Sequence, residues 1–139
     1  QGLAYEDRPL PIGYSQTMQW YYGGAQEQLG RGRSQIRWEG GGSIDLWADP
    51  SYEGWRPQGR VNACAQNAER PDRVIMDVAD DVHADTNWWV GQINTVLGII
   101  RSRYPSARMI VLHPVLGGPG GATGRRPAER LIARRSSCS

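Results

Sequence analysis

A serine that follows a short apolar run is the residue of this sequence best placed to do chemistry. Leu10-Pro11-Ile12 is followed by Gly13, Tyr14 and Ser15, and an amphipathic segment begins at Ser15. This order predicts a strand, a tight turn and a helix, with Ser15 held in the turn. A serine in such a turn is where an α/β hydrolase carries its nucleophile, which needs a neighbouring base. A serine after a glycine is also a common helix N-cap, and that alternative stays open.

Two histidines, His83 and His113, are the candidates for the base. Each follows a predicted strand, so each is expected near the same edge of a parallel sheet, although either could be an ordinary surface histidine. His83 also lies among Asp80, Asp81 and Asp85, whose oxygens could bind a divalent cation. A solvated acidic loop explains this cluster more simply, so we predict no metal site and no cofactor.

Six tryptophans are many for 139 residues. Trp47 and Trp55 lie in residues 43–60, which are rich in Gly, Pro and Asp and are predicted to form a long loop. Aromatic faces in such a loop could stack on sugars or other flat ligands. Trp88 and Trp89 begin a predicted helix, where at least one of them is expected in the core.

Predicted strands and helices alternate along the chain. The strands are expected over 10–12, 35–38, 73–78 and 109–112, and the helices over 15–29, 61–69 and 88–103. Pro9 and Pro11 favour an edge position or an entry for the first strand over a long central strand. The largely apolar runs 73–78 and 109–112 indicate buried strands. Alternation of this kind predicts a parallel sheet with helices on both faces, and a ligand site at the carboxyl ends of its strands.

The composition is that of one globular domain. No apolar run approaches the roughly 20 residues of a membrane helix, so no membrane partner is expected. All 16 basic residues are arginines, and five of them lie in 119–139. We divide the chain into an α/β domain over 1–116 and a flexible Gly/Arg/Ser-rich tail over 117–139, in which the lack of interleaved aromatics argues against nucleic-acid binding. Cys64 and Cys138 either form one disulfide or are independent thiols.

Several segments together resemble the SGNH (GDSL-type) hydrolases, and among them the acetyl-xylan-esterase-like carbohydrate esterases. Residues 8–17 are similar to the family's strand that ends in Gly-Asp-Ser-x-Thr. Residues 52–55, followed by Gly59, resemble the block that supplies a backbone donor to the oxyanion. Residues 71–81 fall where the family has Pro-Asp-x-Val and a strand ending in Gly-x-Asn-Asp, and 99–107 match a helix-to-strand passage. The resemblance covers roughly residues 8–116.

The sequence departs from this family at its catalytic blocks. Tyr14 stands where the family has Asp, Asp81 stands near the oxyanion Asn, and Ala79 replaces a Gly. The Asp-x-x-His block, which carries the family's base and its orienting acid, is absent. An ionised Asp81 would repel an oxyanion, and only its protonated form could donate a hydrogen bond to it.

The resemblance implies a three-layer α/β sandwich with a central parallel sheet, flavodoxin-like and incomplete at its C-terminus. It implies a serine esterase that acts on a small-molecule or carbohydrate ester, for instance an acetylated carbohydrate. Ser15 would be the nucleophile, His83 or His113 the base, and Gly59, Asp81 and Trp55 would lie at the oxyanion and substrate. The expected location is extracellular. The sequence shows no signal peptide, which a mature secreted protein would also lack, so the start of the chain does not decide the compartment. The alternatives are an inactive carbohydrate- or ligand-binding protein on the same fold and a truncated enzyme.

Overall fold

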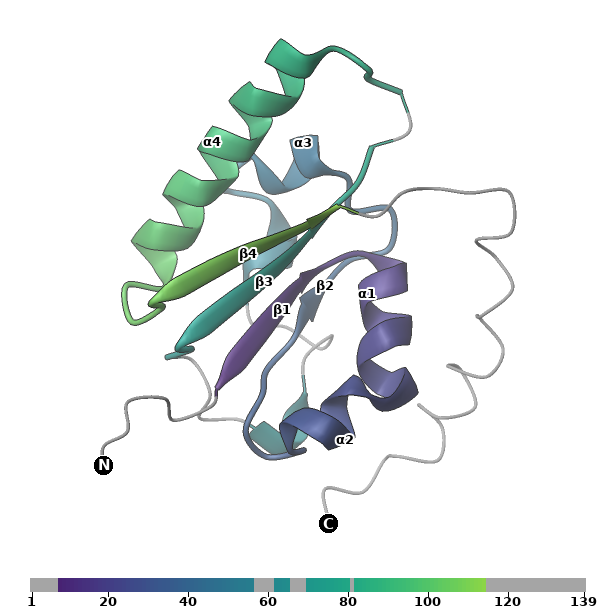
Figure 1. Cartoon of the computed structure of the whole chain (residues 1–139), viewed down its shortest axis with the longest axis vertical. Coiled ribbons are helices and arrows are strands. Elements are labelled where there is room, and N and C mark those ends of the chain that lie inside the picture. Colours follow the sequence, from purple (N-terminus) through teal and green to yellow (C-terminus); the bar gives the residue numbers. More distant parts are fainter. Residues whose placement is uncertain (1–7, 57–61, 66–69, 81, 115–139) are drawn as a thin grey trace.

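The computed structural model describes residues 8–56, 62–65, 70–80 and 82–114 (Figure 1). Four strands alternate with helices along this part of the chain, as the sequence predicts. The elements are β1 (Pro9–Gly13), α1 (Ser15–Trp20), a π-helical turn (Tyr21–Ala25), α2 (Gln26–Leu29), β2 (Arg37–Trp38), α3 (Ile44–Trp47), a 3₁₀ turn (Glu53–Trp55), a second 3₁₀ turn (Ala63–Ala65), β3 (Arg73–Val78), α4 (Thr86–Arg103) and β4 (Met109–Pro114).

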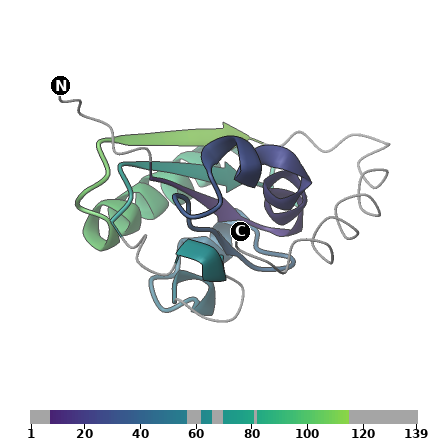
Figure 2. The same ribbon diagram turned by 90° about the horizontal axis from the view of Figure 1, so that it is seen from below.

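The strands form one parallel sheet in the order β2-β1-β3-β4. Figure 2 shows α1 and α2 on one side of this sheet and α4 on the other. The protein is therefore an α/β sandwich, which confirms the predicted fold class. Every connection between parallel strands has to cross over the sheet, which is why the helices cover its faces.

The first strand is internal, so the edge position, one of the two alternatives predicted for it, is wrong. β1 pairs with β2 on one side and β3 on the other. The carbonyl of Gly13 accepts a hydrogen bond from Glu39 N on the β2 side. In a strand, the backbone groups of residues two apart point toward the same neighbouring strand. The backbone nitrogens of Pro9 and Pro11 therefore point to the β2 side, as the carbonyl of Gly13 does. β2 pairs only with Ile12 and Gly13, so the missing N–H groups of the prolines lie where no strand needs them.

Three predicted segments differ from expectation in how much regular structure they contain. The helix over 15–29 is interrupted at Gly24, whose φ of 150° is open to glycine and rare for other residues. Residues 43–56 are not a long loop, because they contain α3 and a 3₁₀ turn. Of the helix expected over 61–69, the described part is the single 3₁₀ turn of Ala63–Ala65.

The main core lies between the sheet and the layer of α3 and α4. Residues of β1, β3 and β4 that face this side alternate with residues that face α1, as a pleated strand requires. Val96, Ile99 and Ile100 of α4 pack against them. The strand residues of this core are Leu10, Ile12, Val74, Met76, Val78, Ile110 and Leu112.

The opposite face of β4 is exposed, contrary to the buried strand that the sequence predicts. Met109 and Val111 are 46% and 40% exposed. Within the described residues α1 and α2 lie beside β1 and leave this part of the sheet open (Figures 1 and 2). The apolar run thus reports burial on one face only.

No described helix is long and apolar enough to cross a membrane. Cys64 is disulfide-bonded, as one of the two alternatives expected. Cys138, the other cysteine of the sequence, lies outside the described residues, as does the predicted tail.

A buried polar network ties the segment before β2 to the segment around the second 3₁₀ turn. The side-chain amide of Asn62 reaches the backbone carbonyls of Arg31 and Ser34 at 2.7 and 2.9 Å and the hydroxyl of Tyr21 at 3.1 Å. Gln35 donates to the carbonyls of Asn62 and Ala65 and accepts from Asn62 N. Asn62 is 3% exposed, so its partners have no water to replace it.

Asn62→Ala should therefore lower the free energy of unfolding by about 2–4 kcal/mol, because it leaves several buried polar groups without partners. The matched control is Asn94→Ala on the exposed surface of α4, which should change stability by less than about 0.5 kcal/mol. Urea unfolding followed by far-UV circular dichroism measures both. Equal midpoints for the two variants would show that the network does not contribute to stability.

Candidate functional site

Gly13, Asp77 and His113 lie in a row across three strands at the carboxyl edge of the sheet. Asp77 pairs directly with His113, and Gly13 follows Ile12, the partner of Met76. All three face the α1 side, opposite to the main core. Because ligands of parallel α/β sheets bind at this edge, the row marks the candidate site.

Asp77 holds the row together through both of its carboxylate oxygens. Its Oδ1 lies 2.9 Å from Nδ1 of His113, and its Oδ2 accepts from the Thr17 hydroxyl at 2.6 Å. Thr17 Oγ1 in turn accepts from Tyr14 N at 3.1 Å, which fixes the turn between β1 and α1. Asp77 is 5% exposed, whereas the His113 side chain is 66% exposed. The carboxylate is therefore rigidly held, and the imidazole projects from it into solvent.

This pairing sets what the imidazole of His113 can do. A carboxylate only accepts hydrogen bonds, so His113 donates through Nδ1 and keeps Nε2 as the proton acceptor. An imidazole oriented in this way by a buried carboxylate is the arrangement of a general base. His113 is one of the two bases predicted from the sequence, whereas Asp77 is not among the predicted site residues. The available signal was an acidic residue among the apolar residues of 74–78.

The turn at Gly13 has no room for a side chain. A Cβ at this position would lie 2.0 Å from Thr17 Oγ1 and 2.9 Å from Asp77 Cβ. Glycine therefore lets β1 and the start of α1 approach Asp77 closely enough for Thr17 to bond to it. The glycine that precedes the serine in the sequence has a packing role that spacing alone does not reveal.

Ser15 is the first residue of α1 and is partly exposed. Its place after β1 is the one predicted, two residues beyond Gly13. Gly13 and His113 are two strand spacings apart, which corresponds to about 10 Å. Among the described residues the Ser15 hydroxyl has no hydrogen-bond partner, so Ser15 and His113 share an edge of the sheet without direct contact. Catalytic hydrogen bonds are often long in a protein without substrate.

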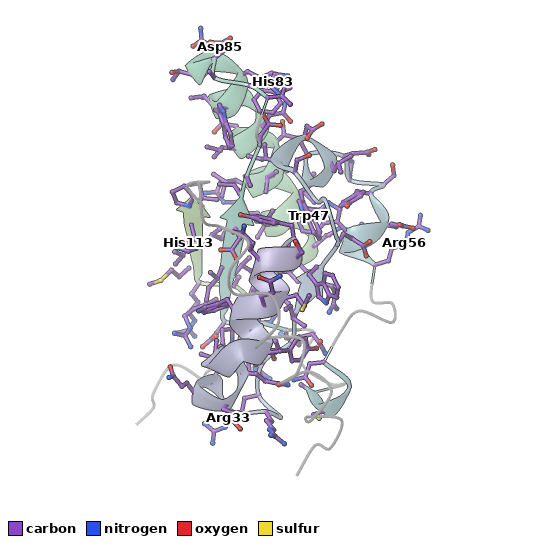
Figure 3. The ribbon with its side chains drawn as sticks, turned by 90° about the vertical axis from the view of Figure 1, so that its right-hand side faces the viewer. Arg33, Trp47, Arg56, His83, Asp85 and His113 are labelled. Carbon is purple, nitrogen blue, oxygen red and sulfur yellow. The ribbon has the colours of Figure 1, made fainter. Side chains whose placement is uncertain are left out.

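A pocket of about 420 Å³ opens beside the row on the α1 side of the sheet. Trp20, which lines it, is 48% exposed, and sequence reasoning missed both this residue and Gln16 as candidates. In Figure 3 the labelled His113 lies at the β4 side of the molecule. The described residues around the pocket are Gln16 and Trp20 of α1, Ile75 and Asp77 of β3, and Val111 and His113 of β4.

His83, the other candidate base, lies elsewhere. Its Nδ1 is 3.0 Å from Asp80 Oδ2, and its ring stacks on Trp88 with centroids 3.8 Å apart. In Figure 3 it lies with Asp85 at the end of the molecule near the start of α4, away from His113. Hydrogen bonds from the His83 and Val82 backbone N–H groups lower the pKa of Asp80, although burial opposes them. Within the described residues no three His, Cys, Asp or Glu side chains could hold a metal ion.

Trp47 and Trp55 belong to the core rather than to a ligand surface, so they offer no face for stacking. They are 0% and 1% exposed, and their rings meet edge to face with centroids 4.9 Å apart. Their indole N–H groups donate to the carbonyls of Gly42 and Trp47. The expected contact of Trp55 with substrate is therefore not met. Gly59 and Asp81, the expected oxyanion residues, lie outside the described residues.

The hydroxyl group of the partly buried Tyr14 lies in the interior, within reach of the charge of Asp77. Its hydroxyl oxygen is inaccessible to solvent and has no hydrogen-bond partner among the described residues. Burial, and then the negative charge of Asp77, raise the pKa of Tyr14 to about 12. Tyr14 thus stays protonated well above neutral pH.

No protein-family model matches the chain, and no curated protein is significantly similar to it.

Gly13→Ala should destabilise the protein by about 1–3 kcal/mol, because the new methyl group overlaps Thr17 and Asp77. Gly98→Ala is the matched control, since a Cβ there meets nothing within 4 Å and α4 gains up to about 1 kcal/mol from the better helix former. Thermal unfolding of both variants tests the pair. A Gly13→Ala protein as stable as wild type would contradict the close approach described above.

Tyr14→Phe should raise stability at neutral pH, because it removes a buried hydroxyl without a partner. The wild type should also lose stability as the pH rises from 10 to 12, because the unfolded tyrosine ionises near pH 10 and the folded one only near 12. The variant should lose less over this window. Chemical denaturation at pH 7, 10 and 11.5 provides the comparison, and parallel pH profiles would refute it.

Proposed function

We propose that this chain is a serine hydrolase of acyl esters, with Ser15 as nucleophile and His113 as general base. The observation that carries the proposal is the hydrogen-bonded pair of buried Asp77 and exposed His113. The pair lies at the carboxyl edge of the sheet, where β1 ends and α1 begins with Ser15. The parallel sheet is also what the resemblance to SGNH hydrolases implies, although the base in this proposal comes from β4 and its orienting acid from β3.

The proposed reaction has two steps. In the first, Ser15 Oγ attacks the ester carbonyl carbon while His113 Nε2 accepts the hydroxyl proton, and the alkoxide leaving group departs with that proton as the alcohol. In the second, water attacks the acyl-serine and gives one proton to His113, which returns it to Ser15 as the acid leaves. Asp77 keeps the imidazole in the required tautomer and stabilises its protonated form in both steps.

The rival binding function is favoured by no observation on this molecule. It rested on tryptophans in the segment 43–60, and Trp47 and Trp55 are buried against each other. Their burial leaves Trp20, on the other face of the sheet, as the exposed tryptophan beside the candidate site.

The test uses p-nitrophenyl acetate with wild type, Ser15→Ala, His113→Ala and His83→Ala. Ser15→Ala should abolish hydrolysis above background, and His113→Ala should lower kcat by about 10²–10⁴-fold. His83→Ala is the matched control, since His83 is also paired with an aspartate but lies away from the pocket, and it should keep wild-type activity. His113 is mostly exposed, so its loss should not unfold the protein.

A fluorophosphonate probe gives a readout that does not depend on the ester chosen. It should label wild type at Ser15 and fail to label Ser15→Ala, with adduct position determined by peptide mass spectrometry. Unlabelled wild type with no esterase activity would overturn the proposal. Equal losses in His113→Ala and His83→Ala would overturn the assignment of the base.

A further inference from the structure

We propose that the pocket beside His113 binds the apolar acyl chain of the substrate, so that the preferred esters carry a chain longer than acetyl. This inference rests on the proposed function for its catalytic part. The evidence is the order of polar and apolar residues along the pocket, which matches a carbonyl group followed by a hydrocarbon chain.

The sheet supplies two rows of side chains to the pocket. The first row is Asp77 and His113, which are paired in register at the carboxyl edge. The second row is Ile75 and Val111, which are also paired, two residues earlier in their strands. Two residues of parallel strand span about 6.6 Å. A ligand whose carbonyl lies at the first row therefore places its next few carbons over an apolar second row.

Helix α1 also presents a polar residue first and an apolar residue farther along the pocket. Gln16 and Trp20 lie one turn apart on the same side of α1, and both line the pocket. Because α1 begins at the carboxyl edge and runs back across the sheet, Gln16 comes first and Trp20 lies about 6 Å farther along. The amide is thus near the catalytic pair, and the indole is near the apolar row.

The size and polarity of the pocket favour an acyl chain over a sugar. A volume of about 420 Å³ is within the range of small-molecule sites, and an acetyl group would leave most of it to water. Both Asp77 oxygens are already occupied by His113 and Thr17. Apart from Nε2 of His113, which the proposed reaction uses, Gln16 is the polar group of the described lining that could meet a sugar hydroxyl, whereas Trp20 and Val111 expose apolar surface.

The first experiment measures kcat/KM for p-nitrophenyl esters from acetate to octanoate with the full chain. The value should rise with chain length by up to about fourfold per methylene group, the factor that 0.8 kcal/mol per buried CH₂ gives at 25 °C. Trp20→Ala and Val111→Asp should flatten this rise. Val90→Asp is the matched control, since Val90 is 49% exposed on α4, and it should keep the wild-type profile. A flat or falling profile in active wild type would overturn the inference and leave the proposed function standing.

The second experiment measures binding without catalysis. Octanoate should quench or shift tryptophan fluorescence in Ser15→Ala, and the change should disappear when Trp20→Tyr is added. Binding of octanoate without any esterase activity would retain the pocket and reject the proposed function. No octanoate binding, with Trp20 already protected from acrylamide quenching, would reject the inference in favour of another occupant. If the protection of Trp20 from acrylamide increased with protein concentration, the occupant of the pocket would be a second copy of the chain. If the protection did not depend on concentration, the occupant would be residues 115–139 of the same chain.

Discussion

The structure of the candidate site depends on the carboxylate of Asp77. A buried carboxylate is costly unless its oxygens are hydrogen-bonded, and here each oxygen has one partner, from α1 and from β4. These two bonds join elements that are far apart in the sequence. They fix the turn that ends in Ser15 and the orientation of His113 at the same time. The requirement for glycine at position 13 follows from the same contact, because α1 has to come close to Asp77.

The sequence predicted the fold well because alternation of apolar strands and an amphipathic helix depends on local periodicity. β3 and α4 lie almost where the patterns placed them. The errors arose where tertiary context decides. Prolines normally indicate an edge, and only the short length of β2 makes them tolerable inside the sheet. An apolar run indicates burial, but it does not say on how many faces, so β4 was expected to be covered on both sides.

The candidate site was predictable in part. The position of Ser15 and the candidacy of His113 follow from the order of strand, turn and histidine. The choice between His83 and His113 does not, because it depends on strand register, which places Asp77 opposite His113 and leaves His83 beside Trp88. The roles of Trp47, Trp55 and Trp20 were also hidden from composition. Trp47 and Trp55 lie in a segment with the composition of a loop, but short helical turns bury them. Trp20 lies on the first helix, but it faces an open part of the sheet.

The prolines of β1 have a consequence for the hydrogen-bond balance of the interior. Among the described elements β2 pairs only with Ile12 and Gly13, yet every residue of β1 is buried. A buried backbone N–H without a partner is costly. Pro9 and Pro11 have no N–H, so they leave no unsatisfied donor on the side of β1 that β2 does not reach.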